Sequence, residues 1–150
     1  MSFIAAAPVA TEPELPHHPF WPAIAPAQAR EVMQLDGSIT TPRLIFALTE
    51  AVTAVNRDLA RWRKEQEAAG YASLDAVPDE ETGRLPFLYR RAVYETAAAD
   101  LMERFIRFDS TGDGQKRAAE QEPAIDDHRR NAFWAVRDIL GKPRSTVELI

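Results

Sequence analysis

The chain has 150 residues, a net charge of −5 and a pI near 5.2, with 45% hydrophobic and 27% charged residues. This length suits one domain with its own core, and no apolar run approaches the length of a membrane span. The acidic balance argues against a protein that grips a nucleic-acid backbone, because such binding needs clustered Lys and Arg. The chain has no cysteine, which excludes disulfides and thiol chemistry. Its beginning shows no basic, apolar pattern, so a secretory signal is not expected.

Residues 1–25 predict an extended arm without a core of its own. Prolines recur there at short intervals and interrupt every helical register, and charged residues are sparse. The arm also contains an apolar group that consists of Phe20, Trp21, Pro22 and Ile24. This group is too hydrophobic to remain in water. Two alternatives stay open: it packs against the chain's own helices, or it lies across a neighbouring copy as an intersubunit contact.

Residues 26–141 show the periodicity of a helical domain. Pro26 suits the first turn of a short helix that ends before Asp36 and Gly37. The apolar face of this helix consists of Ala29, Val32, Met33 and Leu35. The sequence therefore predicts that the domain begins with a short amphipathic helix.

The clearest helix is predicted from Pro42 to Ala69. Thr41 is expected to cap this helix, Pro42 to occupy its first turn and Gly70 to end it. Its apolar residues repeat at intervals of three and four and are Leu44, Leu48, Ala51, Val52, Val55, Leu59 and Trp62. If uninterrupted, the helix spans about 40 Å.

Two more helices are predicted, from about Pro86 to Asp109 and from about Ala124 to Leu140. The apolar stripe of the first consists of Tyr94, Ala97, Leu101, Phe105 and Phe108. The inward residues of the second are Ile125, Ala132, Phe133, Val136, Ile139 and Leu140. Together the segments predict an all-α fold, a small antiparallel helical bundle with an extended proline-rich N-terminal arm.

The tail, residues 142–150, differs from the helices before it. Pro143 lacks an N–H group and restricts the residue before it, so the helix cannot continue. Val147 and Leu149 on either side of Glu148 form a short strand-like alternation. A lone strand leaves its backbone groups unpaired. The tail therefore either frays or pairs with a strand of another chain.

The segment 109–120 has the spacing of a calcium-binding loop. Its potential ligands and the turn glycine are Asp109, Thr111, Asp113, Gly114 and Glu120. Thr111 is a weak ligand, and Lys116 and Arg117 offset the negative charge that a cation needs. A solvated connector is therefore the preferred interpretation of this segment.

Other groups resemble chemical sites only in part. The adjacent His17 and His18 have no third metal ligand nearby. The consecutive Asp126, Asp127 and His128 point in different directions on a helix, and the two carboxylates are expected near its start, where they favour the macrodipole. The arginine pairs at 90–91 and 129–130 are expected to form ion pairs. No phosphate loop, nucleophile elbow or zinc-binding set is present, so neither an enzyme nor a cofactor is predicted.

Several short segments follow one another in an order that is specific as a whole. They are Phe20-Trp21-Pro22-Ala23-Ile24, Thr41-Pro42-Arg43-Leu44, Leu74-Asp75-Ala76-Val77-Pro78, Tyr89-Arg90-Arg91-Ala92-Val93, Trp134-Ala135-Val136-Arg137 and Lys142-Pro143-Arg144. Their order and spacing resemble those of the head completion, or head stabilisation, protein gpL of temperate phages with contractile tails. The resemblance covers the chain from about residue 20 to its last residue.

This resemblance implies a structural subunit of a head-to-tail connector ring, similar to the adaptors that form a dodecamer beneath the portal protein. Such a ring completes the filled head, encloses double-stranded DNA without sequence-specific binding, and carries the next neck or tail-terminator protein. The subunit is then expected in the virion, and in the host cytoplasm during assembly, with no membrane partner. By the same resemblance, the portal-docking residues are Lys142, Arg144, Thr146, Val147, Glu148, Leu149 and Ile150. The alternative is a calcium-responsive or host helical regulatory binding protein.

Overall fold

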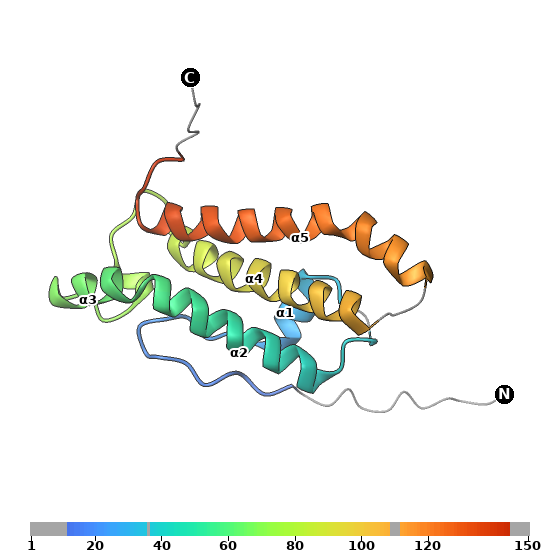
Figure 1. Cartoon of the computed structure of the whole chain (residues 1–150). Coiled ribbons are helices and arrows are strands. Elements are labelled where there is room, and N and C mark those ends of the chain that lie inside the picture. The colour runs from blue at the N-terminus through green and yellow to red at the C-terminus, as the bar shows by residue number, and fades with distance from the viewer. Residues whose placement is uncertain (1–11, 36, 109–111, 145–150) are drawn as a thin grey trace, which may run out of the picture.

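In the computed structural model the protein is all-α, which confirms the predicted fold class (Figure 1). The structure describes residues 12–35, 37–108 and 112–144, with only the backbone described for residues 105–108, 113, 115, 117 and 118. Its elements within these ranges are α1 (Pro26–Val32), α2 (Thr41–Asp58), α3 (Ala60–Ala68), the 3-10 helix η1 (Leu74–Ala76), α4 (Arg84–Phe108) and α5 (Gly112–Ile139). None of these helices is both long and apolar enough to cross a membrane.

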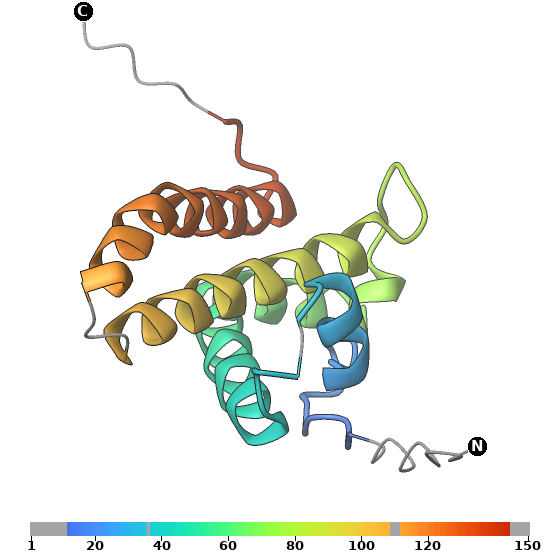
Figure 2. The same cartoon turned by 90° about the vertical axis from the view of Figure 1, so that its right-hand side faces the viewer.

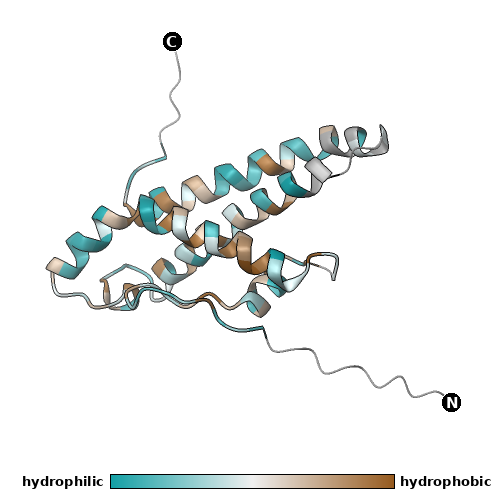
Figure 3. Ribbon diagram, turned by 60° about the horizontal axis from the view of Figure 1, so that its bottom comes forward, coloured by the Kyte–Doolittle hydropathy of each residue, from teal (hydrophilic) through white to brown (hydrophobic). Residues whose placement is uncertain are grey.

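The central element of the fold is α4. Helix α5 runs antiparallel to it on one side, and α2 and α1 lie on the other (Figures 1 and 2). Small side chains allow the close approach of these helices, since Ala92 and Ala97 of α4 and Ala135 of α5 are fully buried. Helix α3 has no buried residue and is largely hydrophilic in Figure 3. The core therefore lies around α4, and α5 is attached to the rest of the molecule mainly through α4.

The second half of the arm is built into this core. Trp21 stacks on Tyr89 of α4 with ring centroids 4.7 Å apart, and its ring lies 6.5 Å from that of Trp62 in α3. Phe20 packs edge-on against Trp21 at 4.8 Å. The Leu74 N–H of η1 donates a hydrogen bond of 2.8 Å to the Phe20 carbonyl. Aromatic stacking and backbone pairing thus hold the arm against the helices.

Tyr89 also contributes a polar contact beneath this stack. Its hydroxyl donates a hydrogen bond of 2.7 Å to Asn56 Oδ1 of α2. Burial raises the pKa of Tyr89, and the contact with Asn56 opposes this only in part. The phenol therefore stays a neutral donor that links α4 to α2 beside the aromatic rings.

The first described residue of the arm, Glu12, is anchored separately. Its Oε1 accepts hydrogen bonds from Arg30 Nη2 at 2.7 Å and from Thr41 Oγ1 at 2.6 Å. These bonds lower the pKa of Glu12. Arg30 Nη1 in turn donates to the Ile39 carbonyl at 2.7 Å. Thr41, predicted to cap α2, instead holds the arm, and Thr40 is the N-cap residue.

Two predicted helix boundaries were wrong. The helix predicted from Pro42 to Ala69 is divided at Leu59 into α2 and α3, although the Leu59 N–H still donates to the Val55 carbonyl at 3.0 Å. No Pro or Gly marks this division in the sequence. Helix α5 begins at Gly112 and runs through Pro123, because the Ala-, Glu- and Gln-rich stretch before Pro123 strongly favours helix. Its first turns are inclined to the rest in Figure 1, as expected beside an internal proline.

Several placements of single residues were also wrong. Val32 and Phe133 were predicted to point inward, but they are 60% and 55% exposed. Asp126 and Asp127 lie in the middle of α5, not near its start. The apolar repeats of α1 and α5 include more hydrophobic residues than the buried face of each helix can hold. Val32 and Phe133 are therefore left exposed. The side chains of Phe105 and Phe108, assigned to the stripe of α4, lie outside the described residues.

We expect Trp21→Ala to lower the free energy of unfolding by about 3–5 kcal/mol, because it removes a nearly fully buried ring from the stack with Tyr89 and Trp62. Urea unfolding followed by far-ultraviolet circular dichroism measures this loss. Phe87→Ala is the matched control, since Phe87 is 61% exposed and its truncation is expected to change stability by about 0.5 kcal/mol or less. Equal effects of the two changes would contradict the role of the stack.

Candidate assembly surfaces

A groove between α2 and α5, with α4 as its floor, has a volume of about 400 Å³. We call it the α2–α5 groove; its lining residues are Ala54, Val55, Asp58, Thr96, Ala132, Phe133, Val136, Arg137, Leu140 and Lys142. The Phe133 side chain stands open to solvent there, with the Arg137 guanidinium 5.4 Å from its ring centroid. A cation–π contact shields one face of this ring. The rest of the wall is mainly apolar, with Asp58, Thr96 and Lys142 as its further polar members.

Charged residues join the same three helices beyond one end of this groove. Arg104 of α4 pairs with Glu50 of α2 at 2.7 Å, and Arg129 of α5 pairs with Glu103 of α4 at 2.5 Å. Arg104 also lies 4.7 Å from the ring centroid of Phe46, which is 52% exposed. These ion pairs tie α5 to α4 and α4 to α2 where the apolar lining ends.

Asp100 of α4 lies among these charges. Burial raises its pKa, and the neighbouring Glu50 carboxylate raises it further, while Arg104 and Arg129 act in the opposite direction. Ionised Asp100 is therefore less well accommodated in the folded chain than in water. At neutral pH the ionised Asp100 carboxylate therefore lowers the free energy of unfolding.

Helix α5 ends in a defined C-terminal turn. Gly141 has a φ of 66°, the left-handed conformation that allows the Lys142 N–H to donate to the Arg137 carbonyl at 3.0 Å. The Arg137 side chain then donates to the Pro143 carbonyl at 2.8 Å. Since Arg137 also stacks on Phe133, one side chain connects the groove to the start of the tail.

Arg144, the last described residue, is held in the same way. Its Nη2 donates to Asp138 Oδ2 at 2.8 Å, and its guanidinium lies 5.4 Å from the ring centroid of Trp134. Hydrogen bonds to Asp138 raise the pKa of Arg144, which keeps this side chain charged. The tail therefore leaves the helical domain from a fixed point beside the α2–α5 groove.

The predicted portal-docking residues divide into two groups. Lys142 and Arg144 lie at this fixed point, and Lys142 also lines the groove. Thr146, Val147, Glu148, Leu149 and Ile150 lie outside the described residues. Their docking role stays a prediction.

The predicted intersubunit arm residues lie within the chain's own core. Phe20, Trp21 and Ile24 are 1 to 2% exposed, and Pro22 is half-buried. Of the two alternatives for this group, the structure shows packing against the chain's own helices. An exchange of the arm between neighbouring copies stays a prediction.

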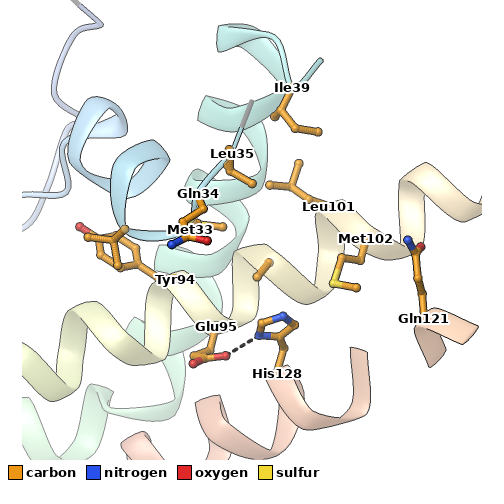
Figure 4. Close-up of a pocket in the computed structure, with 12 residues that line it drawn as sticks. Met33, Gln34, Leu35, Ile39, Tyr94, Glu95, Leu101, Met102, Gln121 and His128 are labelled. Atoms are coloured by element: carbon orange, nitrogen blue, oxygen red, sulfur yellow. Dashed lines mark hydrogen bonds and ion pairs between the residues drawn. The ribbon is translucent and has the colours of Figure 1, made fainter. Parts of the chain in front are cut away.

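A second hollow, of about 430 Å³, lies between the end of α1, α4 and α5 (Figure 4). We call it the α1–α5 pocket; its lining residues are Val32, Met33, Gln34, Leu35, Ile39, Tyr94, Glu95, Ala98, Leu101, Met102, Gln121 and His128. His128 Nδ1 lies 2.6 Å from Glu95 Oε2 and joins α5 to α4 there. The pocket is thus mainly hydrophobic, and its polar members are Gln34, Gln121 and the Glu95–His128 pair.

The residues considered for catalysis or metal binding do not converge. His18 Nδ1 accepts a hydrogen bond from the Phe20 N–H at 3.1 Å, so this ring orders the arm. Asp127 pairs with Arg130, whereas His128 pairs with Glu95. No group of three or more potential metal-binding side chains occurs in the part of the chain that the structure describes.

The interpretation of 109–120 as a calcium loop, or as a solvated connector, is wrong from Gly112 onward, because these residues form the first turns of α5. A calcium loop requires a sharp turn at its sixth position, whereas Asp113 and Gly114, at the fifth and sixth positions, lie within the helix. Residues 109–111 lie outside the described residues.

Sequence reasoning missed three residues of these surfaces. Phe133 was assigned to the core, and neither the pairing of Glu95 with His128 nor the exposure of Phe46 was predicted. A weak signal existed for Phe133, since Arg137 follows it by one helical turn and places a cation above the ring. No local pattern indicates the pairing of Glu95 with His128, because it depends on how α4 and α5 pack.

Comparison with known proteins decides the family. The family model described as "Phage head completion protein (GPL)" matches residues 15–150. The "Head completion/stabilization protein" of Escherichia phage P2 is 35% identical over 147 residues, which cover 95% of this chain and 86% of the phage protein. The chain belongs to the phage head completion protein family. No solved structure matches it.

This assignment confirms the resemblance seen in the sequence. The chain is a phage head completion protein, a structural component of the virion, and its family is one of assembly proteins. The surfaces that matter are therefore those that contact other virion components. The family assignment replaces the alternative of a calcium-responsive or host regulatory protein.

We expect Asp100→Asn to raise the free energy of unfolding at neutral pH. Folding raises the pKa of the Asp100 carboxyl above its unfolded value of 3.8. The native protein is therefore not penalised below pH 3.8, where the carboxyl is protonated in both states. The penalty develops as the pH rises through the folded pKa and the carboxyl ionises. The gain should therefore be present at pH 7 and disappear toward pH 3. Chemical unfolding at both pH values measures it. Asp127→Asn, at an exposed ion pair, is the control and should give little change.

Proposed function

We propose that this head completion protein is a subunit of a ring that binds below the portal, stabilises the DNA-filled head and provides the platform for neck or tail attachment. The observation that carries the proposal is the fixed exit of the tail. Arg137, Asp138 and Trp134 hold residues 143 and 144, so the segment that follows starts from a defined position. An anchored, strand-like segment suits attachment to a sheet edge of a partner.

Docking on the portal protein is assigned to the tail. Val147, Leu149 and Ile150 supply strand-forming side chains, and strand addition satisfies backbone groups that a lone strand leaves unpaired. Lys142 and Arg144 at the base of the tail add positive charge beside it. The main-chain pairing supplies affinity, and the alternating side chains supply register.

Ring formation is assigned to the flanks of α5. A closed ring needs a heterologous interface, in which each subunit presents two different surfaces. The α2–α5 groove, with the exposed Phe133, is one candidate surface. An exchange of the arm between copies is a second contribution, in which Phe20, Trp21, Pro22 and Ile24 fill the corresponding site of the neighbour. We expect a dodecamer of identical subunits.

The role of the ring toward DNA follows from charge. A subunit with a net charge of −5, repeated around a channel, repels phosphate groups and leaves double-stranded DNA free to slide. The ring thus encloses DNA without reading its sequence. Its far side offers the surface for a neck or tail-terminator protein, which places the subunit at the head–tail junction after assembly in the host cytoplasm.

We expect deletion of residues 145–150 to leave the helical fold intact but to abolish attachment to the cognate portal. The reason is that, among the described residues, those before position 145 already form a core and the C-terminal turn of α5. Co-sedimentation with purified portal and electron microscopy measure attachment, and circular dichroism checks the fold. Portal attachment at the level of the intact chain would contradict the docking assignment, and global unfolding would place the tail in the subunit's own core.

We expect Phe133→Ser to separate ring formation from portal attachment. The change removes an exposed apolar contact of the α2–α5 groove but leaves the tail unchanged. Single subunits should still attach to the portal, while electron micrographs should show incomplete rings. Phe87→Ser is the control, since Phe87 is equally exposed but lies outside the groove. Complete rings with both variants would exclude the groove as an interface between subunits.

A further inference from the structure

Helix α3 projects from the body of the molecule. It continues the path of α2 beyond the start of α4 and forms one end of the helical domain (Figure 1). None of its nine residues is buried. Two ion pairs between residues four apart support it from within, Arg61–Glu65 at 3.0 Å and Arg63–Glu67 at 2.8 Å. A polar helix of this kind contributes little to the core, so its sides are open to contacts with another chain.

One side of this projecting end is basic. Arg57 of α2 and Arg61 and Lys64 of α3 follow one another at intervals of four and three residues. The Leu59 N–H donates to the Val55 carbonyl, so the helical spacing continues across the division between α2 and α3. The three cations therefore share one side of the helix. We call them the basic row.

The cations of the basic row are only loosely engaged within their own chain. Arg57 lies 3.8 Å from Asp58 and Arg61 lies 3.0 Å from Glu65, and the two arginine side chains are 79% and 94% exposed. Exposed pairs of this kind contribute little free energy and exchange readily with solvent. Lys64 is exposed and forms no ion pair within the part of the chain that the structure describes. The row is therefore able to pair with carboxylates of another chain.

A hollow of about 480 Å³ lies on the other side of α3, between this helix, the loop before α4 and the end of α5. We call it the acidic hollow; the lining residues that bear on its partner are Trp62, Gln66, Asp79, Glu80 and Glu81. Trp62 and Gln66 are four residues apart and partly buried, whereas the basic row is exposed. The acidic hollow and the basic row thus lie on opposite sides of one helix.

Two carboxylates of the acidic hollow remain without a cation. Asp79 pairs with Arg84 at 3.1 Å, and Asp138 pairs with an arginine at the base of the tail at 2.8 Å. Glu80 and Glu81 are exposed, and neither forms an ion pair with any residue that the structure describes. Placed side by side, they create a negative potential that attracts cationic side chains. The acidic hollow is therefore complementary in charge to the basic row.

The positions of these two surfaces favour a second copy of the chain as the partner. Because they lie on opposite sides of α3, they are not directed at one another within one chain. A neighbour related by rotation can place its basic row against the acidic hollow, which is the heterologous contact that a closed ring needs. Leu140 lines both the acidic hollow and the α2–α5 groove, so the two hollows are continuous.

We propose that the basic row of one subunit binds the acidic hollow of the next, with Arg61 and Lys64 opposite Glu80 and Glu81. This inference rests on the proposed ring and names the charged part of its interface. Complementary charges at an exposed contact set orientation and the choice of partner more than they set affinity. The apolar α2–α5 groove beside the acidic hollow supplies the buried area.

The lack of cysteine in the chain allows a direct test of this contact. Lys64→Cys and Glu81→Cys chains are prepared separately, mixed in equal amounts, assembled on the cognate portal and oxidised. We expect a disulfide-linked dimer in the mixture but not with either variant alone, because the contact joins different surfaces of two copies. Gln28→Cys, at an exposed position of α1, replaces either partner as the control and should give no dimer.

Charge reversal tests the electrostatic basis of the contact. We expect Arg61→Glu with Lys64→Glu to lose complete rings at low salt, and Glu80→Lys with Glu81→Lys to do the same. One chain that carries all four changes should regain them, because its two surfaces are again complementary. Arg43→Glu, at the exposed start of α2, is the control and should keep complete rings. Circular dichroism checks that the variants fold, as expected for exposed positions.

The outcomes separate this inference from the proposed function. Rings of the intact chain that give no cross-link between positions 64 and 81, or that persist in the charge-reversed variants, overturn the inference and leave the ring in place. Dimers of Lys64→Cys alone indicate a two-fold contact and also overturn it. An intact chain that forms no ring on the portal in electron micrographs overturns both.

Discussion

The stacking of Trp21 between the arm and the helices is the contact on which the rest of the arrangement depends. The arm makes few backbone contacts, such as the bond of the Leu74 N–H to the Phe20 carbonyl, so its position depends mainly on its side chains. Trp21 and Phe20 supply that position through Tyr89 and Trp62, and the hydrogen bond of Tyr89 to Asn56 fixes the ring beneath them. Once the arm is seated there, Glu12 meets Arg30 and Thr41 across the start of α2. Loss of the stack would therefore release both the arm and the anchor at its beginning.

The central place of α4 has a different consequence. Because α2 and α5 both pack on α4, α5 has two open flanks instead of being enclosed by neighbours. One flank is the α2–α5 groove with Phe133, and the other is the α1–α5 pocket beside His128. A monomeric enzyme of this size has little use for two such surfaces, whereas an assembly protein needs several. The Arg129–Glu103 ion pair keeps α5 in register with α4, and the Arg104–Glu50 pair joins α4 to α2.

Much of the fold could be predicted from periodicity, since Leu44, Leu48 and Val55 of α2 and Tyr94, Ala97 and Leu101 of α4 are buried as their spacing indicates. The family could be predicted from the order of short segments. The break at Leu59 and the early start of α5 could not, because the first lacks a local signal and the second runs through a proline. The exposure of Phe133 was missed because spacing alone cannot distinguish a core position from an interface position. The pairs Glu95–His128 and Arg30–Glu12 join segments far apart in the sequence, so only the packed structure brings them together.

The positions of the three tryptophans give the molecule its own optical readout. Trp21 and Trp62 both belong to the aromatic stack that holds the arm, whereas Trp134 lies under the Arg144 guanidinium at the exit of the tail. The indole emission of the first two therefore reports on the seating of the arm, and that of Trp134 on the state of the C-terminal turn. A Trp134→Phe version keeps only the two tryptophans of the stack and reports on the arm, and the difference from the emission of the intact chain reports on the C-terminal turn. Fluorescence can then follow the arm and the C-terminal turn separately in the isolated subunit.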